Sequence, residues 1–267
     1  MDFYAHFGLR TLPFTRELLI QERFPHPQHT DHLKMMLRMI EQRQSLALIG
    51  AAGLGKTVLV RALQEQLADV RYRVHYVKVT GLSKRDMSRE IALSLGLSAV
   101  GTFPRLLRMI QDAVVERSLD DGVRSVIILD DAHEMRPHVL GMFKALTNFE
   151  MDSRLLLSVV LVGQPALTRL LQRADLEDVA QRIAWYGHLR GLSREETQRY
   201  VAHRCQIAGA TSVLFDGHAT ESLYEMSRGN PRALDHLARR ALELAHDQKV
   251  ERVGSQHVIA ARATLHP

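Results

Sequence analysis

Five short apolar runs stand out along the chain, and segments with helical periodicity separate the first four of them. Short runs rich in β-branched and aliphatic residues are typical of strands, whereas apolar residues three and four positions apart indicate amphipathic helices. Strands that alternate with helices favour a parallel sheet covered on both faces. The third and fourth runs are almost wholly apolar, which predicts central strands. The predicted strands are Ser45–Ile49, Val74–Val79, Val126–Leu129, Leu155–Val162 and Tyr186–Leu189.

Helices are predicted both inside this alternation and after it. Ser83 and Asp86 cap a helix that follows the second strand, and the next helix carries Leu106, Ile110 and Val114 on one face. Beyond the last strand the predicted helices run from a Ser193–Glu196 capping box through Ile207, from about Gly217 to Ser227, from Pro231 to Ala245, and near Gln256 to Ala263. We therefore expect an N-terminal arm and linker helix (1–40), an α/β domain (41–190) and a helical lid (191–267).

The composition is close to the globular average. Of the 267 residues, 46% are hydrophobic and 24% charged, which excludes collagen-like, purely coiled-coil and wholly disordered chains. A net charge of +5 favours a polyanionic partner, with a solvated basic surface as the alternative. The single cysteine, Cys205, allows neither an internal disulfide nor a zinc cluster and reads as a core residue. Without a leader-like start or a long apolar stretch, we expect a cytoplasmic protein that does not enter a membrane.

The first strand leads directly into a glycine-rich loop. The sequence Gly50-Ala51-Ala52-Gly53-Leu54-Gly55-Lys56-Thr57 follows Ile49 and opens an apolar helix at Val58. Glycines at this spacing let successive amide N–H groups turn onto phosphate oxygens, and the helix N-terminus adds a positive dipole. Lys56 supplies a charge to the phosphates, and Thr57 offers a hydroxyl to Mg²⁺. The loop therefore predicts a nucleotide site formed by residues 50–58.

The third strand ends in two adjacent carboxylates, Asp130 and Asp131. Unpaired charges at the edge of a core are costly, so this pair predicts a bound cation. We expect Asp130 to hold Mg²⁺ alongside Thr57, and Asp131 to face an attacking water. Two aspartates that only cap the following helix are the alternative, which the upstream loop disfavours.

The glycine-rich loop, the strand ending in Asp130-Asp131-Ala132-His133 and the later motifs resemble those of AAA+ ATPases. The segment from Tyr4 to Phe14 is similar to the N-terminus of the ExeA-like group, which includes secretion ATPases and transposition regulators of the TnsC, TniB and MuB type. An apolar arm packed on the core is the alternative for this segment. The resemblance implies ATP and Mg²⁺ as cofactors. It also implies an α/β P-loop AAA+ fold, with a five-stranded parallel sheet in the order 5-1-4-3-2 and a small helical lid.

The resemblance implies roles for three further residues. Gln164, after the fourth strand, matches the sensor-1 residue that hydrogen-bonds the attacking water or the γ-phosphate; a turn glutamine is the alternative. Arg182, before the last strand, matches the arginine finger offered to a neighbouring subunit, with a surface arginine as the alternative. Arg232, which follows Pro231 at the start of a lid helix, matches sensor 2. A finger that acts on a neighbour implies a homo-oligomer, either a hexameric ring or a helical filament.

Position 131 departs from the family pattern, in which glutamate is common. Aspartate is one methylene shorter, and a displacement on the order of 1 Å can slow a reaction ~100-fold when the group must contact the reacting water. We therefore expect slow ATP hydrolysis and a protein that acts mainly as an ATP-held switch.

Basic residues cluster on the two helices after the second strand, namely Lys84, Arg85, Arg105 and Arg108. In related DNA-loaded ATPases this region faces a central channel, so the resemblance implies sequence-independent contacts with the phosphates of double-stranded DNA. A solvated helical face is the alternative. The neighbouring His26, His29 and His32 lack the partners of a metal pattern, and we expect no metal there.

These features favour a transposition regulator that assembles on DNA with ATP and links target DNA to a transposase and a target-selector protein. We expect DNA rather than secretion because the chain lacks the membrane-spanning segment and extra length of ExeA-like secretion proteins. An ATPase for secretion or export assembly is the runner-up. A non-catalytic DNA-binding scaffold that uses ATP only for folding and assembly is the third interpretation.

Overall fold

The computed structural model describes residues 2–15, 17, 19–67, 70–120 and 122–265, and it divides the chain into two compact units. The α/β unit comprises residues 28–52 and 56–189. The helical unit comprises residues 1–27, 53–55 and 190–267. Each unit buries an apolar cluster of its own, so each has the core expected of a separately packed body.

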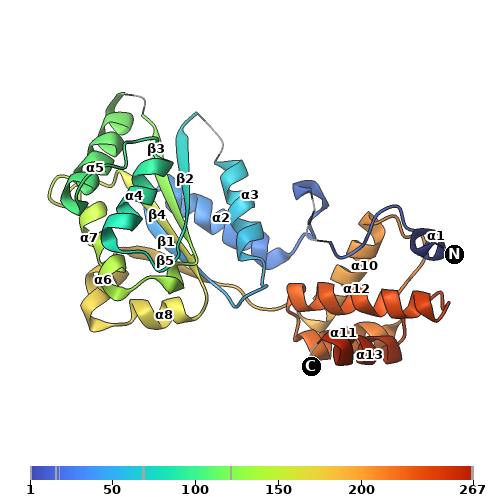
Figure 1. The fold of residues 1–267 in the computed structure, drawn as a ribbon. Coiled ribbons are helices and arrows are strands. Elements are labelled where there is room, and N and C mark those ends of the chain that lie inside the picture. The colour runs from blue at the N-terminus through green and yellow to red at the C-terminus, as the bar shows by residue number, and fades with distance from the viewer. Residues whose placement is uncertain (1, 16, 18, 68–69, 121, 266–267) are drawn as a thin grey trace. The chain divides into compact units, whose positions relative to one another are not determined.

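A five-stranded parallel sheet forms the centre of the α/β unit (Figure 1). Its order is β2-β3-β4-β1-β5, which confirms the predicted order. All residues of β1 and β4 are buried, as are all but the first of β3, because these central strands have a neighbour on both edges and helices on both faces. The strands are β1 Ser45–Ile49, β2 Tyr72–Lys78, β3 Arg124–Asp130, β4 Leu157–Gly163 and β5 Ile183–His188.

The two edge strands begin before their predicted starts. β5 begins at Ile183 rather than Tyr186, and β2 begins at Tyr72 rather than Val74. Both strands carry exposed residues between buried ones, so their apolar runs are interrupted. The start of each strand is therefore hidden from a search for continuous apolar residues.

The strand order places β4 between β1 and β3. The Gly50 amide donates to the carbonyl oxygen of Gly163 at 3.0 Å, and the Val79 amide donates to the carbonyl oxygen of Asp130 at 2.8 Å. Because all strands are parallel, their carboxyl ends meet at one edge of the sheet, where ligands bind in open α/β folds. This edge therefore holds the loop that begins at Gly50, Gln164 after β4, and the end of β3.

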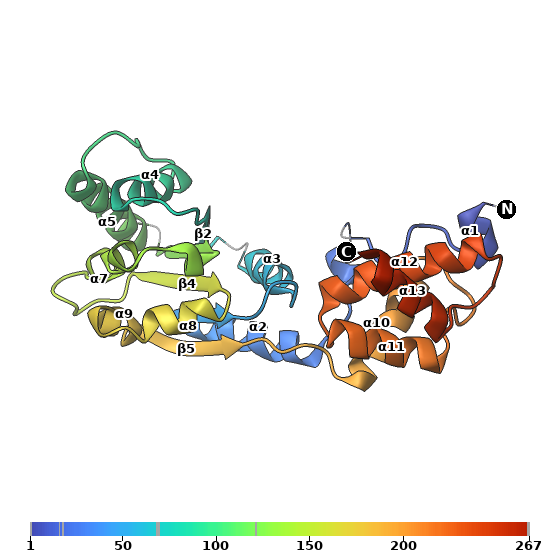
Figure 2. The same cartoon turned by 60° about the horizontal axis from the view of Figure 1, so that its bottom comes forward.

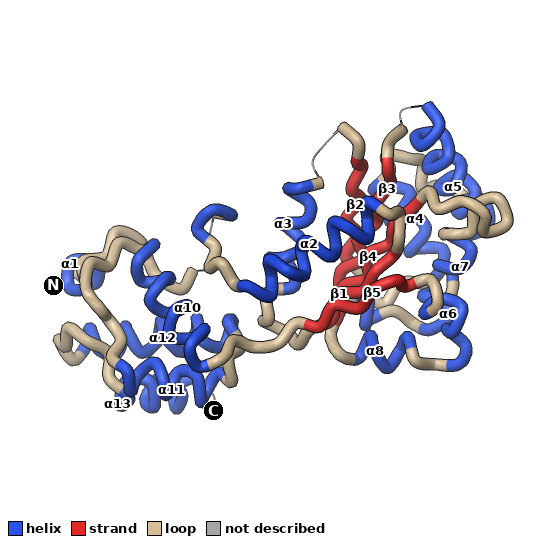
Figure 3. Tube along the Cα trace, turned by 180° about the vertical axis from the view of Figure 1, so that it is seen from behind, coloured by secondary structure: helices blue, strands red, loops and turns tan. Residues whose placement is uncertain are grey.

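Helices cover both faces of the sheet, as predicted (Figure 3). One face carries α2 (Pro27–Glu41) and α3 (Lys56–Gln66), which bury Met36 and Leu63 among others. On the other face, residues of α4 to α9 form one apolar cluster with strand residues such as Ile127 and Val159. This second layer consists of α4 Lys84–Ser94, α5 Phe103–Asp120, η2 Ala132–Glu134, α6 Pro137–Leu140, α7 Met142–Leu146, α8 Ala166–Leu171, η3 Ala174–Leu176 and α9 Glu177–Ala180.

The helical unit is built from helices with well-defined starts (Figure 2). The predicted capping box is confirmed, since Ser193 Oγ accepts from the Glu196 amide and the Glu196 side chain accepts from the Ser193 amide. Asn230 caps the helix that begins at Pro231, and Pro231 occupies its first turn. The helices are α10 Arg194–Ile207, α11 Gly217–Ser227, α12 Pro231–Asp247 and α13 Ser255–Leu265, close to the predicted segments.

The N-terminal segment packs within the helical unit. It forms α1 (Phe3–Phe7) and a short 3₁₀ turn, η1 (Ile20–Glu22). Phe7 and Phe14 are buried in the same apolar cluster as Phe215, and the Arg10 amide donates to the Ala208 carbonyl oxygen at 2.7 Å. The segment that carries the N-terminal resemblance is therefore an apolar arm folded onto the helical unit.

Candidate functional site

The loop between β1 and α3 has the backbone that its glycines predict. Gly53 and Gly55 have φ angles of +85° and +87°, values that residues with a side chain rarely adopt. A Cβ at Gly50 would lie 2.9 Å from the Leu189 Cβ, so a larger residue would collide there. The loop ends where α3 begins, at Lys56. Each glycine of the motif thus meets a local requirement that another residue would strain.

Lys56 is held inside this loop. Its ammonium donates to the carbonyl oxygens of Gly50 at 2.7 Å and Ala51 at 3.0 Å, and the residue is only 9% exposed. Thr57 and Val58 follow at the first turn of α3 and are exposed. A buried ammonium beside a helix N-terminus attracts an anion, so the loop suits a phosphate group.

Asp130, at the end of β3, has one donor on each carboxylate oxygen. The Asp131 amide donates to Oδ1 at 2.9 Å, and the Tyr76 hydroxyl donates to Oδ2, also at 2.9 Å. Asp130 is 6% exposed. Burial, and next the hydrogen bond to Asp130, raise the pKa of Tyr76, so its hydroxyl keeps its proton and remains a donor. The buried carboxylate is thereby fixed in one orientation, as a metal ligand requires.

Tyr76 was not singled out by the sequence. It pairs in register with Ile128, two residues before Asp130, and its long side chain reaches along the strand to the carboxylate. The pairing of β2 with β3 and the alternation of side chains along a strand are the signals that identify it. The pairing also needs the register of the two strands, which the sequence did not supply.

Asp131, His133 and Gln164 come together beside Asp130. Asp131 has a left-handed backbone, with φ of +58°, at the start of the η2 turn. His133 Nε2 lies 2.8 Å from Gln164 Nε2, and His133 Nδ1 lies 4.0 Å from Asp131 Oδ1. Gln164 directly follows β4, and its contact with His133 spans the ends of two adjacent strands. A left-handed aspartate is a strained residue of the kind that gathers at functional sites.

Arg182 lies at the amino ends of the strands, whereas the glycine-rich loop lies at their carboxyl ends. Arg182 directly precedes β5, in which Ile183 pairs with Ser45, the first residue of β1. The glycine-rich loop, in contrast, follows the last residue of β1. With a rise of ~3.3 Å per residue, the length of β1 separates these edges by about 16 Å. The structure therefore does not bring Arg182 to the loop of its own chain.

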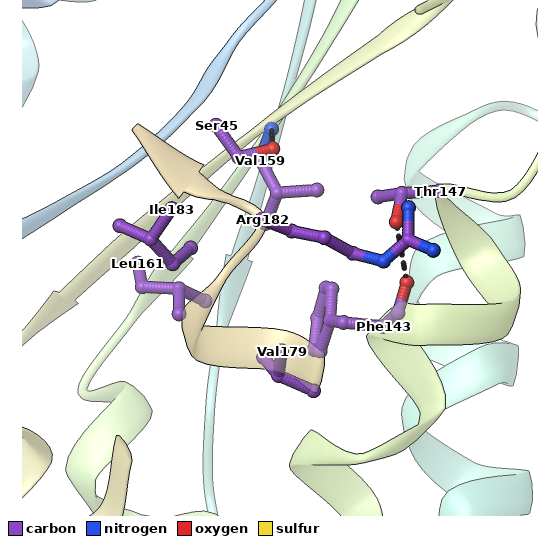
Figure 4. Close-up of a pocket in the computed structure, with 8 residues that line it drawn as sticks. All are labelled: Ser45, Phe143, Thr147, Val159, Leu161, Val179, Arg182 and Ile183. Atoms are coloured by element: carbon purple, nitrogen blue, oxygen red, sulfur yellow. Dashed lines mark hydrogen bonds between the residues drawn. The ribbon is translucent and has the colours of Figure 1, made fainter. Parts of the chain in front are cut away.

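The Arg182 guanidinium is paired with Asp152. Its Nη1 donates to Asp152 Oδ1 at 2.8 Å, and its Nη2 donates to Oδ2. This hydrogen bonding lowers the pKa of Asp152 and raises that of Arg182. The arginine stem also lines a small, mostly apolar pocket beside Phe143 and Ile183 (Figure 4). Arg182 is thus ordered, one quarter exposed, and balanced by an exposed carboxylate.

The predicted basic residues meet where α4 and α5 begin. Ser83 caps α4 through the Asp86 amide, as predicted. Arg85 donates to the Gly101 carbonyl oxygen at 3.1 Å, and the Lys84 ammonium lies 5.9 Å from the centre of the Phe103 ring. A Cβ at Gly101 would lie 3.1 Å from the Arg105 Cδ. Lys84, Arg85 and Arg105 therefore gather around one loop, and Arg108 lies exposed a turn further along α5.

Other predicted features have definite places. Arg232 is exposed in the first turn of α12. Cys205 is buried, as predicted for a core residue, and burial raises the pKa of its thiol to about 12. Within the described part of the chain, histidine, cysteine, aspartate and glutamate nowhere form a group of three fit for a metal ion. Among the described helices, none has the length and apolar character needed to cross a bilayer.

Comparison with known proteins gives a family and a curated relative. The AAA domain family matches residues 38–171. General secretion pathway protein A of Aeromonas hydrophila is 33% identical over 243 residues, an alignment that covers 88% of this chain and 43% of that protein. The chain therefore spans less than half the length of this relative.

Solved structures share the fold at lower identity. Cdc6p from Pyrobaculum aerophilum has a TM-score of 0.73 at 18% identity, over 94% of this chain and 70% of that chain. The Aeropyrum pernix ORC1 protein in complex with DNA has a TM-score of 0.67 at 17% identity, over 96% of this chain and 70% of that chain. These likenesses show the fold that the parallel sheet defines. The family follows from the sequence match over residues 38–171: the chain belongs to the AAA domain family.

Proposed function

We propose that this chain binds ATP with Mg²⁺ at the loop after β1 and hydrolyses it. The observation that carries this proposal is the Lys56 ammonium, buried among the carbonyl oxygens of a loop in which Gly53 and Gly55 have left-handed backbones. Phosphate oxygens suit such a cradle, with the amides of residues 50–58 as further donors. Thr57 and Asp130 would hold the Mg²⁺, which neutralises charge on the phosphates when bound.

The remaining residues act on the water and the γ-phosphate in this proposal. Asp131 faces the attacking water, and Gln164 hydrogen-bonds the water or the γ-phosphate. Arg232, in the first turn of α12, contacts the nucleotide. Hydrolysis is slow, because the Asp131 carboxylate is one methylene shorter than the glutamate common in the family.

Tyr76→Phe should raise the Mg²⁺ concentration needed for half-maximal ATP turnover by about 10-fold, the lower end of the usual effect of losing a hydrogen bond to a metal ligand. The hydroxyl holds Asp130 Oδ2 at 2.9 Å, and phenylalanine leaves the ring but releases the carboxylate. ATP turnover titrated with Mg²⁺ measures the change.

Tyr72→Phe is the matched control for this prediction. Tyr72 lies on the same strand and on the same face, and its hydroxyl accepts from Arg124 at 3.4 Å, away from Asp130. We expect its Mg²⁺ dependence to equal that of the parent chain. An unchanged Mg²⁺ dependence in Tyr76→Phe would remove Tyr76 from the metal site.

The active form in this proposal is an oligomer, a hexameric ring or a helical filament. Arg182 supports this, because it lies at the edge of the sheet opposite its own loop yet carries an ordered guanidinium. A neighbouring subunit would receive it at the γ-phosphate. ATP that contacts two subunits would then stabilise the assembly.

The biological role that we propose is that of an ATPase in secretion or export assembly. The 33% identity to general secretion pathway protein A, over 88% of this chain, supports this role above a transposition regulator. The comparisons add no support for the transposase and target-selector partners expected from the sequence. The runner-up interpretation of the sequence is thus the better supported one.

Deletion of the gene tests this role. We expect the deletion strain to release less exported protein, and the parent gene, but not one carrying Lys56→Ala, to restore release. Western blots of the culture medium and of the cells measure how much exported protein is released and how much is retained. Normal release in the deletion strain would contradict the secretion role while leaving ATP hydrolysis to be judged on the purified protein.

A second candidate function is ATP-dependent binding to double-stranded DNA. The observation that favours it is the gathering of Lys84, Arg85 and Arg105 around one loop at the starts of α4 and α5. The fold is also that of the Aeropyrum pernix ORC1 protein, whose structure is a complex with DNA. Cations of this kind would contact phosphates without reading base sequence.

If DNA binds there, replacing Lys84 and Arg85 together by alanine should flatten the salt dependence of binding. Each lost phosphate contact changes the slope of log affinity against log salt by about 0.9, so the pair should change it by about 1.8. Fluorescence anisotropy with two duplexes of unrelated sequence measures both slopes. Arg239→Ala with Arg240→Ala removes the same charge elsewhere and serves as the control. An unchanged slope would exclude this cluster.

A further inference from the structure

His133 is a partly buried histidine whose side chain is enclosed by polar groups. It belongs to the η2 turn after β3, and its side chain is 9% exposed. Asp131, Glu134 and Gln164 face the ring from the turn itself and from the end of β4. A Cβ on Gly163 would lie 3.3 Å from the His133 amide nitrogen, so the end of β4 packs tightly on this turn. The ring is therefore fixed in place between two strand ends.

Two groups face Nε2 of the ring, the Gln164 amide nitrogen at 2.8 Å and Glu134 Oε1 at 3.4 Å, and the closer contact sets the tautomer. Gln164 Nε2 is an amide nitrogen, which donates hydrogen bonds but does not accept them. At 2.8 Å from His133 Nε2 it therefore donates, and the ring nitrogen accepts. In a neutral imidazole the proton then resides on Nδ1. That nitrogen is a buried atom without a hydrogen-bond partner, and Asp131 Oδ1 lies 4.0 Å from it.

Asp131 is placed to satisfy this donor. It is 36% exposed and has a strained left-handed backbone, so its side chain is not locked into the core. A shift of about 1 Å would bring Oδ1 within hydrogen-bond distance of Nδ1. An orphaned buried donor favours such a shift, because unpaired polar groups are costly in a protein interior.

We propose that His133 is a positioning residue that links Gln164 to Asp131. Gln164 fixes the ring through Nε2, and the Nδ1–H then orients the carboxylate that faces the attacking water. The inference rests on the proposed hydrolysis, in which Gln164 contacts the γ-phosphate and Asp131 the water. A change in the contact between Gln164 and the γ-phosphate thereby alters the orientation of the Asp131 carboxylate through the His133 imidazole.

Two substitutions at position 133 separate the two contacts. In His133→Asn the side-chain amide nitrogen stands close to where Nδ1 stands, and in His133→Gln the amide stands close to where Nε2 stands. We expect His133→Gln to lower kcat about 10- to 100-fold, since a displaced catalytic group costs up to ~100-fold. His133→Asn should recover most of that loss, and KM should stay within about twofold in both variants. Exposed His138→Asn is the control, with parental kcat.

A double-mutant cycle with Asp131→Asn tests the link itself. If His133 acts through Asp131, His133→Gln should lower kcat by less than about twofold in the Asp131→Asn background. Equal effects of His133→Gln in both backgrounds would overturn the proposal. So would equal kcat values for His133→Asn and His133→Gln, because the link needs the donor at the Nδ1 position. Circular dichroism melting confirms that each variant is folded.

A spectroscopic measurement is independent of turnover. In the folded full chain with ¹⁵N-labelled histidine, the His133 signal, assigned by its loss in His133→Asn, should have the shifts of the Nδ1–H tautomer. Gln164→Leu should move it toward the Nε2–H tautomer. An Nε2–H ring that Gln164→Leu leaves unchanged would overturn the inference. A chain that binds ATP without hydrolysing it would contradict only the proposed hydrolysis, while these spectra still decide the Gln164–His133 link.

Discussion

Lys56→Ala should lower the affinity for ATP by on the order of 100-fold. Its ammonium donates to two loop carbonyl oxygens, and bound phosphates would give it charged acceptors instead. Hydrogen bonds between charged groups contribute about 3 kcal/mol, which is roughly 100-fold in affinity. Alanine leaves the phosphate cradle without its buried cation. Titration with a fluorescent ATP analogue measures the loss.

A matched lysine gives the control for this variant. Lys34 is exposed on α2, in the same unit, and Lys34→Ala removes one charge outside the loop. We expect parental affinity for Lys34→Ala and folded spectra for both variants. Unchanged nucleotide affinity in a folded Lys56→Ala chain would show that the loop after β1 is not the nucleotide site.

Arg182→Ala should reduce ATP turnover by about 1,000-fold or more, the usual effect of losing an arginine finger, while ATP binding stays close to that of the parent chain. The arginine lies at the amino edge of the sheet, and the loop follows the carboxyl edge. The substitution therefore leaves the chain's own cradle intact but removes a cation offered to a neighbour. Steady-state turnover and nucleotide titration together separate the two effects.

Mixed assemblies decide whether Arg182 acts on a neighbouring subunit. Lys56→Ala subunits keep Arg182, and Arg182→Ala subunits keep the loop, so a mixture should recover turnover that neither variant has alone. Arg173→Ala is the control, because Arg173 is also paired with an aspartate, Asp175, at 2.8 Å. If folded variants co-assemble and no mixture recovers activity, the assignment of Arg182 to a neighbouring site is wrong.

The Asp152 contact adds an internal check on this assignment. Asp152 holds both ends of the guanidinium in the isolated chain, and a neighbour's phosphate would compete with that carboxylate. Asp152→Asn keeps Arg182 but weakens the pairing. It should therefore retain turnover where Arg182→Ala loses it.

Local sequence determined the secondary structure of this protein and the position of its glycine-rich loop. The central strands, the helix caps at Ser83 and Ser193 and the glycine-rich loop are each specified by residues close together in the chain, and the structure has them within a few residues of the predicted bounds. Ser45–Ile49 was identified without error because all its residues are buried and all but Ser45 are apolar. The edge strands were shortened because exposed residues interrupt their apolar pattern. The strand order came from the family resemblance, since parallel strands carry no local signal for their neighbours.

The fine arrangement of the candidate site depends on tertiary structure. Tyr76 and Asp130 are 54 positions apart, His133 and Gln164 are 31 apart, and Asp152 and Arg182 are 30 apart. Each pair meets only after the sheet has brought β2, β3 and β4 side by side, or a loop has folded back onto the start of β5. Sequence patterns arise from contacts between near neighbours along a helix or strand. Hydrogen bonds between distant side chains leave no such periodic trace, so their partners were decided by the packing of the strands.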